Sequence, residues 1–462
     1  MQNLQYKWLA MLTVSIGTFM ATLDASIVNV SLPTITAALN TNLVTIQWVV
    51  SIYLLVITGL LLTLGRLADL IGRKPIFIAG FIVFTVGSML CGLSHTAFLL
   101  IAFRGFQAVG AAMIMANGPA IITDAFPREE RGKAMGLTGM VVATGLTVGP
   151  ALGGFVIAAW GWPWIFFINL PVGIIGIAVA WKILPHEPRG IEKHFDVPGA
   201  ILLTLSLVSL TLALNQGSER GWSSPFIWSL LAGFVVFGIL FILVERASVH
   251  PVLDLELFRN RLFAAASASA FINFAATFAV TFLMPFYLSQ VLGYGPQRMG
   301  LTLTAVPLTV AAIAPISGNL SDRIGSRFLG SLGLGIASIG LLLIGFLGSD
   351  PMPYRVILSL VVLGLGTAIF QSPNSSAIMG SVPPTMLGVA AGMLATMRNL
   401  GMVTGVALTG AIYLSRQMHY VALMGTLPAS VHAFRDAFVV AAVICALGVF
   451  ASAAKGPTVG RE

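Results

Sequence analysis

Two isolated charges of opposite sign are the residues of this sequence most able to do chemistry. Asp24 is the only formally charged residue between positions 8 and 65, and Arg104 is the only one between positions 75 and 123. The residues around them are mostly apolar, and a charge at the centre of a bilayer costs about 2.5–3.5 kcal/mol on insertion scales. A carboxylate and a guanidinium kept at such a cost are expected to pair with each other or to take part in proton transfer.

The two charges are predicted to lie at the same depth. The apolar block that carries Asp24 ends near Pro33, about nine residues later, and the block that carries Arg104 begins near Phe98, six residues earlier. With a helical rise of 1.5 Å per residue, both lie roughly 10–14 Å below one surface. An ion pair 4 Å apart gains about 4 kcal/mol at an effective dielectric of 20. Burial disfavours a charged carboxylate and a nearby cation favours it, so the pattern fits either a structural pair or a carboxylate that exchanges a proton for a cationic substrate.

The elements that hold these charges are predicted to be transmembrane helices. The chain is 57% hydrophobic and 9% charged, with a mean hydropathy of +0.96, whereas soluble domains carry about 25% charged residues. Backbone polar groups in lipid must be paired within the chain, and long apolar blocks favour helices over a barrel. The fold class is therefore an all-α polytopic membrane protein, which we expect in the inner (plasma) membrane.

The net charge of +8 does not indicate nucleic-acid binding. The basic residues sit in short loops between apolar blocks, and the sequence has no basic face with interleaved aromatic residues. Cys91 and Cys445 each lie inside an apolar block without the spacing of zinc ligands, so we expect neither a disulfide nor a metal site.

Fourteen apolar blocks are long enough to cross a bilayer. They lie near 9–32, 46–64, 76–94, 98–122, 135–159, 165–184, 198–215, 226–244, 263–289, 299–319, 328–347, 355–372, 387–414 and 434–453. If the N-terminus is cytoplasmic, 17 of the 24 basic residues fall in cytoplasmic segments, and 5 fall in outer loops: Arg220, Arg298, Arg355, Arg416 and Arg435. The positive-inside rule favours this orientation, with both termini cytoplasmic.

An internal repeat divides the chain into halves. The segment Gly65-Arg-Leu-Ala-Asp69-Leu-Ile-Gly-Arg73 shares its pattern with the segment that runs from Gly318 through Asp322 to Arg327. The two copies of the segment begin 253 residues apart, at Gly65 and Gly318, which is more than six helices need. The extra length matches one pair of helices, at 198–215 and 226–244. We therefore predict a six-helix half at 1–190, an inserted helix pair at 191–250 and a second six-helix half at 251–462. Duplicated halves are typical of secondary transporters, which bind substrate between them near the midplane.

Further residues are candidates for gating and for substrate contact. Glycines four apart with Gly149 and Pro150 among them indicate a closely packed, bent helix, and Asp69, Arg73 and Asp322 sit where a loop could latch one side closed. The alternatives are ordinary helix packing and ordinary loop charge. Arg398 is either buried near the midplane or carried on a helix that projects into the cytoplasm. Polar and aromatic residues inside the blocks could line a cavity: Trp48, Tyr53, Asn117, Asn273, Tyr287, Gln290, Gln371 and Asn399.

The sequence offers no sign of an enzyme. It contains neither a phosphate-binding G-x-x-x-x-G-K-[ST] loop nor an H-E-x-x-H or G-x-S-x-G motif. We therefore expect no cofactor and no ATP hydrolysis on this chain. A proton gradient is the expected energy source, because its use requires only one residue that can bind a proton, Asp24.

The order of the motifs resembles the major facilitator superfamily, in its fourteen-helix drug:proton antiporter branch. The segments 65–74 and 318–327 resemble the two copies of the superfamily's loop signature, and those from Arg104, at 145–154, at 23–33 and at 164–173 resemble signatures of its helices. Ala108 stands where the helix-4 signature usually has glycine. The resemblance implies a bundle of two six-helix halves plus two helices, proton coupling through Asp24 and Arg104, and a latch between the halves at Asp69 and Arg73.

Our leading hypothesis is a proton-coupled exporter of lipophilic compounds, neutral or with one positive charge, that works by alternating access. Spans 9–14 hold no acidic residue except Asp436 at a boundary, which argues against dications. An exporter or flippase of a lipid or endogenous metabolite on the same fold is the alternative, and a channel or membrane enzyme is a third class. We expect the partners to be a small lipophilic substrate, protons and membrane lipids, with the chain acting as a monomer.

Overall fold

The computed structural model describes residues 2–127, 130–185, 196–248, 255–383 and 387–455, and these form helices joined by short loops. The first helices are α1 (Gln2–Ala38), α2 (Leu43–Ile71), α3 (Arg73–Gly92), α4 (Ala97–Ala125), α5 (Arg131–Trp160), α6 (Trp164–Phe167), α7 (Asn169–Ile183), α8 (Val197–Arg220) and α9 (Pro225–Ala247). They are followed by the short helices η2 (Leu255–Arg259) and η3 (Tyr287–Val291) and by α10 (Arg261–Phe286), α11 (Pro296–Leu303), α12 (Ala305–Ile324), α13 (Ser326–Gly345), α14 (Pro353–Gly380), α15 (Leu387–Met424) and α16 (Thr426–Ala453).

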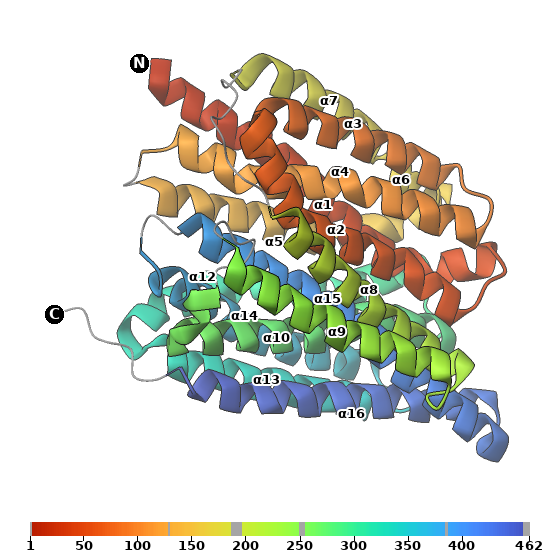
Figure 1. The fold of residues 1–462 in the computed structure, drawn as a ribbon. Helices are drawn as coiled ribbons and strands as arrows, with labels where there is room; N and C mark the ends of the chain where they lie inside the picture. The colour runs from red at the N-terminus through yellow and green to blue at the C-terminus, as the bar shows by residue number, and fades with distance from the viewer. Residues whose placement is uncertain (1, 128–129, 186–195, 249–254, 384–386, 456–462) are drawn as a thin grey trace. The chain divides into compact units, whose positions relative to one another are not determined.

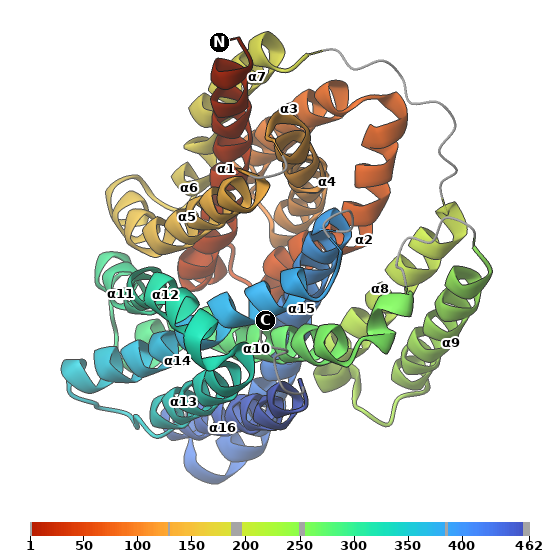
Figure 2. The same ribbon diagram turned by 90° about the vertical axis from the view of Figure 1, so that its left-hand side faces the viewer.

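The helices belong to two compact units. Unit 1 takes its residues from 1–209 and 232–254, and therefore holds α1–α7; unit 2 takes its residues from 210–231 and 255–462, and therefore holds α10–α16. Helices α8 and α9 contribute a part to each unit. Within each unit the long helices run beside one another (Figure 1), and the view turned by 90° shows α3 next to α4 in unit 1 and α13 next to α16 in unit 2 (Figure 2).

The helices have the length and hydropathy of membrane spans. Among the described residues, twelve helical stretches are long and apolar enough to cross a bilayer. Two further helices lie outside that set: α8, whose apolar part Pro198–Leu214 is shorter, and α15, which is 38 residues long. The prediction of an all-α polytopic membrane protein is confirmed to this extent.

The sequence repeat corresponds to a repeated turn. Helix α2 is followed by Gly72 with φ of 100°, and α12 by Gly325 with φ of 86°. In each copy the glycine N–H donates to a carbonyl four residues earlier, at a distance of 2.9 Å. A positive φ costs glycine little, so one residue ends the first helix and the next helix begins directly after it. Both copies of the loop signature therefore serve to join two antiparallel helices with almost no intervening loop.

The hairpin of α15 and α16 extends beyond the predicted spans. We expected spans to end at 414 and to begin again at 434, whereas α15 continues to Met424 and α16 begins at Thr426. The reason is that polar residues pair across this hairpin: Gln417 Nε2 donates to Ser430 Oγ at 3.0 Å, and the hydroxyl of Tyr420 donates to Asp436 Oδ2 at 2.8 Å. Apolar blocks mark where a helix enters lipid and do not mark where the helix stops.

The glycine stripe of α5 packs against α1, the helix that carries Asp24. A Cβ on Gly149 would stand 2.5 Å from Ser26 Oγ and 2.6 Å from Ser26 Cβ, and one on Gly145 would stand 2.2 Å from Thr22 Oγ1. Ser26 Oγ also donates to the carbonyl of Leu146 at 3.0 Å. Small residues let two helix backbones approach closely in a membrane, so the stripe fixes α1 within unit 1.

We predict that Gly149→Ala destabilises the protein, because its methyl group would overlap Ser26 and force α1 and α5 apart. Overpacking of this kind costs about 1–3 kcal/mol, which thermal unfolding of the purified protein in detergent would report as a lower Tm. Gly139→Ala, on the same helix with no atom within 4 Å of the added Cβ, is the matched control and should leave Tm unchanged or raise it. Equal Tm values for the two variants would contradict the close contact.

Candidate functional site

Asp24 and Arg104 form a buried ion pair in unit 1. Asp24 lies on α1 and Arg104 on α4, and the distance from Arg104 NH1 to Asp24 Oδ2 is 2.6 Å. The side chains are 0% and 1% exposed. Neither charge is solvated by water or placed against lipid, so each depends on its partner and on neighbouring hydrogen bonds for compensation.

Two amides complete the coordination of the carboxylate. Asp24 Oδ1 accepts a hydrogen bond from Gln107 Nε2 at 3.0 Å and another from Asn169 Nδ2 at 2.9 Å. The hydroxyl of Ser88 accepts from both of these amide nitrogens, at 3.2 and 2.9 Å, and donates to the carbonyl of Phe166 at 2.9 Å. These bonds join α1, α3, α4 and α7 into one network.

The guanidinium of Arg104 is held on several sides. Its Nε donates to the carbonyl of Val49 at 3.3 Å, and NH1 also donates to Gln107 Oε1 at 2.8 Å. Its central carbon lies 4.0 Å from the ring centroid of Tyr53, a cation–π distance. Tyr53, which the sequence suggested as a cavity residue, is buried, and its hydroxyl lies 3.4 Å from the carbonyl of Ala21. In this arrangement its ring packs against the ion pair.

Local sequence features bring the four helices within reach of one another. A Cβ on Gly87 of α3 would stand 2.7 Å from Gln107 Cα, so the glycine lets α3 approach α4 and sets Ser88 beside Gln107. Asn169 is the first residue of α7, after a short break at Ile168 that follows the four-residue helix α6. The break places an amide, rather than the middle of an apolar helix, against the carboxylate.

Sequence reasoning did not select Ser88, Gln107 or Asn169 as site residues. Gln107 and Asn169 both occur in motifs recognised from the sequence, but a lone amide in an apolar block is more often an interhelical packing residue. The available signal for Gln107 was its position three residues after the isolated charge of Arg104, and Asn169 had no comparable signal. The contacts between them depend on helix packing, which the sequence pattern does not reveal.

The remaining cavity candidates are dispersed over both units. In unit 1, Trp48 is half-buried, and Asn117 is buried with Nδ2 donating to Met113 O at 2.6 Å in its own helix. In unit 2, the buried Tyr287 donates to Gly348 O at 2.8 Å. The others in that unit differ in exposure: Gln290 is exposed, Gln371 and Arg398 are half-buried, and Asn273 and Asn399 are buried.

Unit 2 contains a group of buried polar atoms without hydrogen-bond partners among the described residues. Both Asn273 side-chain atoms on α10, Asn399 Nδ2 on α15 and Asn374 Oδ1 on α14 are in this state. Helices α10, α14 and α15 pack together. A buried amide without a partner costs about 1–3 kcal/mol, so these atoms are suited to bind water or a polar group of a ligand.

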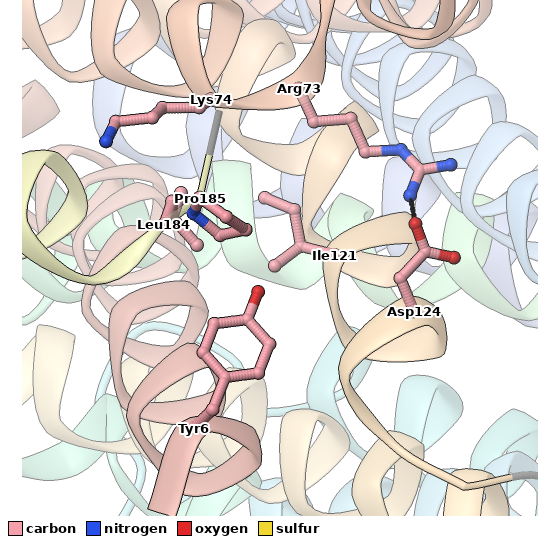
Figure 3. A pocket seen from close by; sticks show the side chains of 7 residues that line it. All are labelled: Tyr6, Arg73, Lys74, Ile121, Asp124, Leu184 and Pro185. Carbon is pink, nitrogen blue, oxygen red and sulfur yellow. Dashed lines mark hydrogen bonds and ion pairs between the residues drawn. The ribbon is translucent and has the colours of Figure 1, made fainter. Parts of the chain in front are cut away.

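The gating candidates make contacts inside unit 1 where they are described. Arg73 NH1 pairs with Asp124 Oδ2 of α4 and lies beside a small pocket whose walls include Tyr6 and Lys74 (Figure 3). The pocket volume is about 10 Å³, no more than one water needs. Gly149 and Pro150 are buried in α5, and the side chains of Asp69 and Asp322 lie outside the described part of the structure.

Comparison with known proteins places the chain in a family. The model of the Major Facilitator Superfamily matches residues 14–268 and 266–459. The chain belongs to the Major Facilitator Superfamily. This family consists of transporters and not enzymes, and the chain is accordingly a multi-pass membrane transporter; in bacteria such proteins lie in the plasma membrane.

Two named bacterial proteins are similar in sequence over most of the chain, and one solved structure shares its fold. The riboflavin transporter RibZ of Clostridioides difficile is 37% identical over 447 residues, which cover 96% of this chain and 97% of RibZ. The multidrug resistance protein Stp of Mycobacterium tuberculosis is 33% identical over 405 residues, which cover 87% of this chain and 75% of Stp. A bacterial homologue of the human lysosomal transporter Spinster shares the fold, with a TM-score of 0.70 at 17% identity over 97% of both chains.

We predict that Asn169→Ala lowers the stability of this superfamily member, because Asp24 Oδ1 and Ser88 Oγ each lose a buried partner. The expected cost is about 1–3 kcal/mol, measured by thermal unfolding in detergent. Asn117→Ala is the control, since Asn117 is equally buried but bonds only to its own helix. The network assigned to Asn169 would be refuted if the two variants unfolded at the same temperature.

Proposed function

We propose that this chain is a proton-coupled exporter of lipophilic compounds, neutral or singly cationic, from the fourteen-helix drug:proton antiporter branch of the superfamily. The observation that carries the proposal is the buried pair of Asp24 and Arg104, at 2.6 Å. Asp24 is the only acidic residue in the apolar part of α1, and its carboxylate accepts from three donors on two other helices, α4 and α7. Similarity to a protein named for multidrug resistance supports the class of cargo.

Protonation of Asp24 would change the balance of forces in unit 1. The ionised carboxylate binds Arg104 and two amides, whereas a neutral carboxyl group no longer attracts the guanidinium. An ion pair 4 Å apart is worth about 4 kcal/mol at an effective dielectric of 20, enough to shift a two-state equilibrium by about three orders of magnitude. In the proposed cycle, proton binding and cargo binding exclude each other, and proton entry from outside resets the transporter after cargo leaves.

The proposed topology has fourteen spans with both termini in the cytoplasm. Helices α8 and α15 would add to the twelve stretches that meet the length and hydropathy criteria. Six-helix halves would lie at 1–190 and 251–462 with an inserted pair at 191–250, and the excess of basic residues in alternate loops supports the orientation. In this scheme Asp69, Arg73 and Asp322 belong to the cytoplasmic latch, and Gly149 and Pro150 to a bent gate helix.

The unpartnered amides of unit 2 are the proposed substrate contacts. Asn273 and Asn399 offer donors and an acceptor that bond to nothing else among the described residues. The apolar blocks of 251–462 hold no acidic residue apart from the boundary residue Asp436, so a second positive charge on the cargo would lack a counter-charge there. Gln371 and Arg398, which are half-buried in the same unit, are further proposed contacts, and Trp48 remains a separate candidate in unit 1.

A second candidate is transport of a polar heteroaromatic metabolite. Identity of 37% to a riboflavin transporter over nearly the whole chain favours it. The same amides would suit a flat ring system with carbonyl and N–H groups, because such a ligand satisfies buried donors and acceptors that a purely lipophilic compound leaves unpaired. The two candidate functions therefore differ in the compound that is transported, and they share the proposed proton site.

We predict that Asp24→Asn abolishes uptake driven by a proton gradient in everted membrane vesicles, because the amide cannot bind and release a proton. The panel contains neutral and singly cationic lipophilic dyes together with riboflavin. Asp350→Asn is the control, since Asp350 is an exposed acidic residue in the loop before α14, and it should transport as the wild type does.

An exchange assay without a proton gradient shows whether Asp24→Asn has lost proton coupling or has failed to fold. Asp24→Asn should retain exchange of labelled for unlabelled cargo across the membrane. The coupling role fails if the variant keeps gradient-driven uptake. Uptake of riboflavin without uptake of any dye would select the metabolite candidate over the drug exporter.

A further inference from the structure

A second cavity lies in unit 2, at the polar ends of α15 and α16. Its volume is about 680 Å³, within the range of about 300–1,000 Å³ usual for small-molecule sites. Its walls come from α15, from α16 and from Trp222, which follows α8. None of its lining residues belongs to the ion-pair network or to the unpartnered amides.

One end of this cavity is positively charged. Asp436 Oδ2 accepts from the Tyr420 hydroxyl at 2.8 Å and lies 3.3 Å from Arg416 Nε, while Arg435 donates to Asp436 Oδ1 at 3.1 Å. Two guanidiniums against one carboxylate leave an excess of one positive charge. The Arg416 side chain is 54% exposed, and its ion pair with Asp436 uses Nε rather than the terminal nitrogens. Such a guanidinium can bind a phosphate or carboxylate with two hydrogen bonds.

The other end of the cavity is apolar. Leu408 and Ile412 on α15 face it together with Val439 and Val440 on α16. Along α15 the residues that line the cavity change from apolar at Leu408 to polar and charged at Arg416 and Tyr420. At 1.5 Å per residue, Leu408 and Tyr420 are about 18 Å apart along the helix. This gradient matches the length of a molecule that has a charged head and an apolar chain.

Trp222 lines this cavity and also packs against α8. A Cβ on Gly217 of α8 would stand 2.7 Å from the Trp222 ring, so glycine allows the indole to lie against that helix. Tryptophan and tyrosine are enriched at the boundary between lipid and water, and here Trp222 and Tyr420 line the same cavity. The inserted helix pair thus supplies a wall to a site of unit 2.

We propose that this cavity binds an amphiphile with one anionic headgroup, phosphate or carboxylate, beside Arg416, and with its apolar chain between Leu408 and Val439. Two sources share this chemistry, an anionic membrane lipid and a soluble single-chain amphiphile. In the topology proposed above, this end of the α15–α16 hairpin is at the outer face of the membrane. The site is independent of the proton chemistry of Asp24.

The test is direct binding to the purified full-length chain in a neutral detergent, by native mass spectrometry and by the shift in Tm. The probes are phosphatidylglycerol and dodecyl phosphate, with phosphatidylcholine and inorganic phosphate as comparators that lack either the net charge or the chain. We expect both probes to bind at least tenfold more tightly than either comparator. Binding of phosphatidylglycerol but not of dodecyl phosphate would identify a membrane lipid as the ligand. Equal binding of both probes would show that one alkyl chain and one anionic headgroup are enough for binding.

Arg416→Gln should weaken probe binding about tenfold or more, since it removes a charge-assisted hydrogen bond. Trp222→Ala should weaken it through loss of the aromatic wall, and this second variant leaves the Asp436 cluster intact. Arg355→Gln is the matched control, because Arg355 is an exposed arginine of the same unit that does not line the cavity. Unchanged binding by both Arg416→Gln and Trp222→Ala, or equal affinity for phosphatidylcholine, would overturn the proposal.

Discussion

The structure of unit 1 depends on the need to compensate a carboxylate that is buried completely. Asp24 and Arg104 are 0% and 1% exposed, and removal of one partner from such a pair typically costs about 3–5 kcal/mol. To compensate the charge of the Asp24 carboxylate, hydrogen-bond donors on α4 and α7 must lie next to α1. Glycines at the contacts between α3 and α4 and between α1 and α5 allow these helices to pack closely enough. The packing of four helices is thus organised around one charge.

The buried amides of the two units differ in whether they have hydrogen-bond partners. In unit 1 the amides of Gln107 and Asn169 are bonded to the carboxylate, so the network is rigid as long as the charge persists. In unit 2 both side-chain atoms of Asn273 and the Nδ2 atom of Asn399 remain without partners among the described residues. One unit therefore holds a charge whose loss would loosen its packing, and the other offers unsatisfied groups to a ligand. This division suits a transporter in which a proton and a cargo bind at separate places.

Sequence reasoning could predict features that are local or repeated. The isolated charges at Asp24 and Arg104, the duplicated turn at Gly72 and Gly325 and the membrane class follow from composition and spacing alone. The role of Asn169 could not be predicted, because it depends on a break between α6 and α7 and on the approach of a helix distant in sequence. The ends of α15 and α16 could not be predicted for a related reason, since pairing across a hairpin extends both helices beyond the apolar blocks.

In the proposed mechanism, the buried carboxylate of Asp24 gives up a proton when cargo binds. Purified protein in detergent, equilibrated at low buffering capacity with Asp24 protonated, should release protons on addition of a transported compound, as read by a pH-sensitive dye. We expect release by the wild type and none by Asp24→Asn when binding of the compound itself is retained. Equal release from both proteins would contradict it.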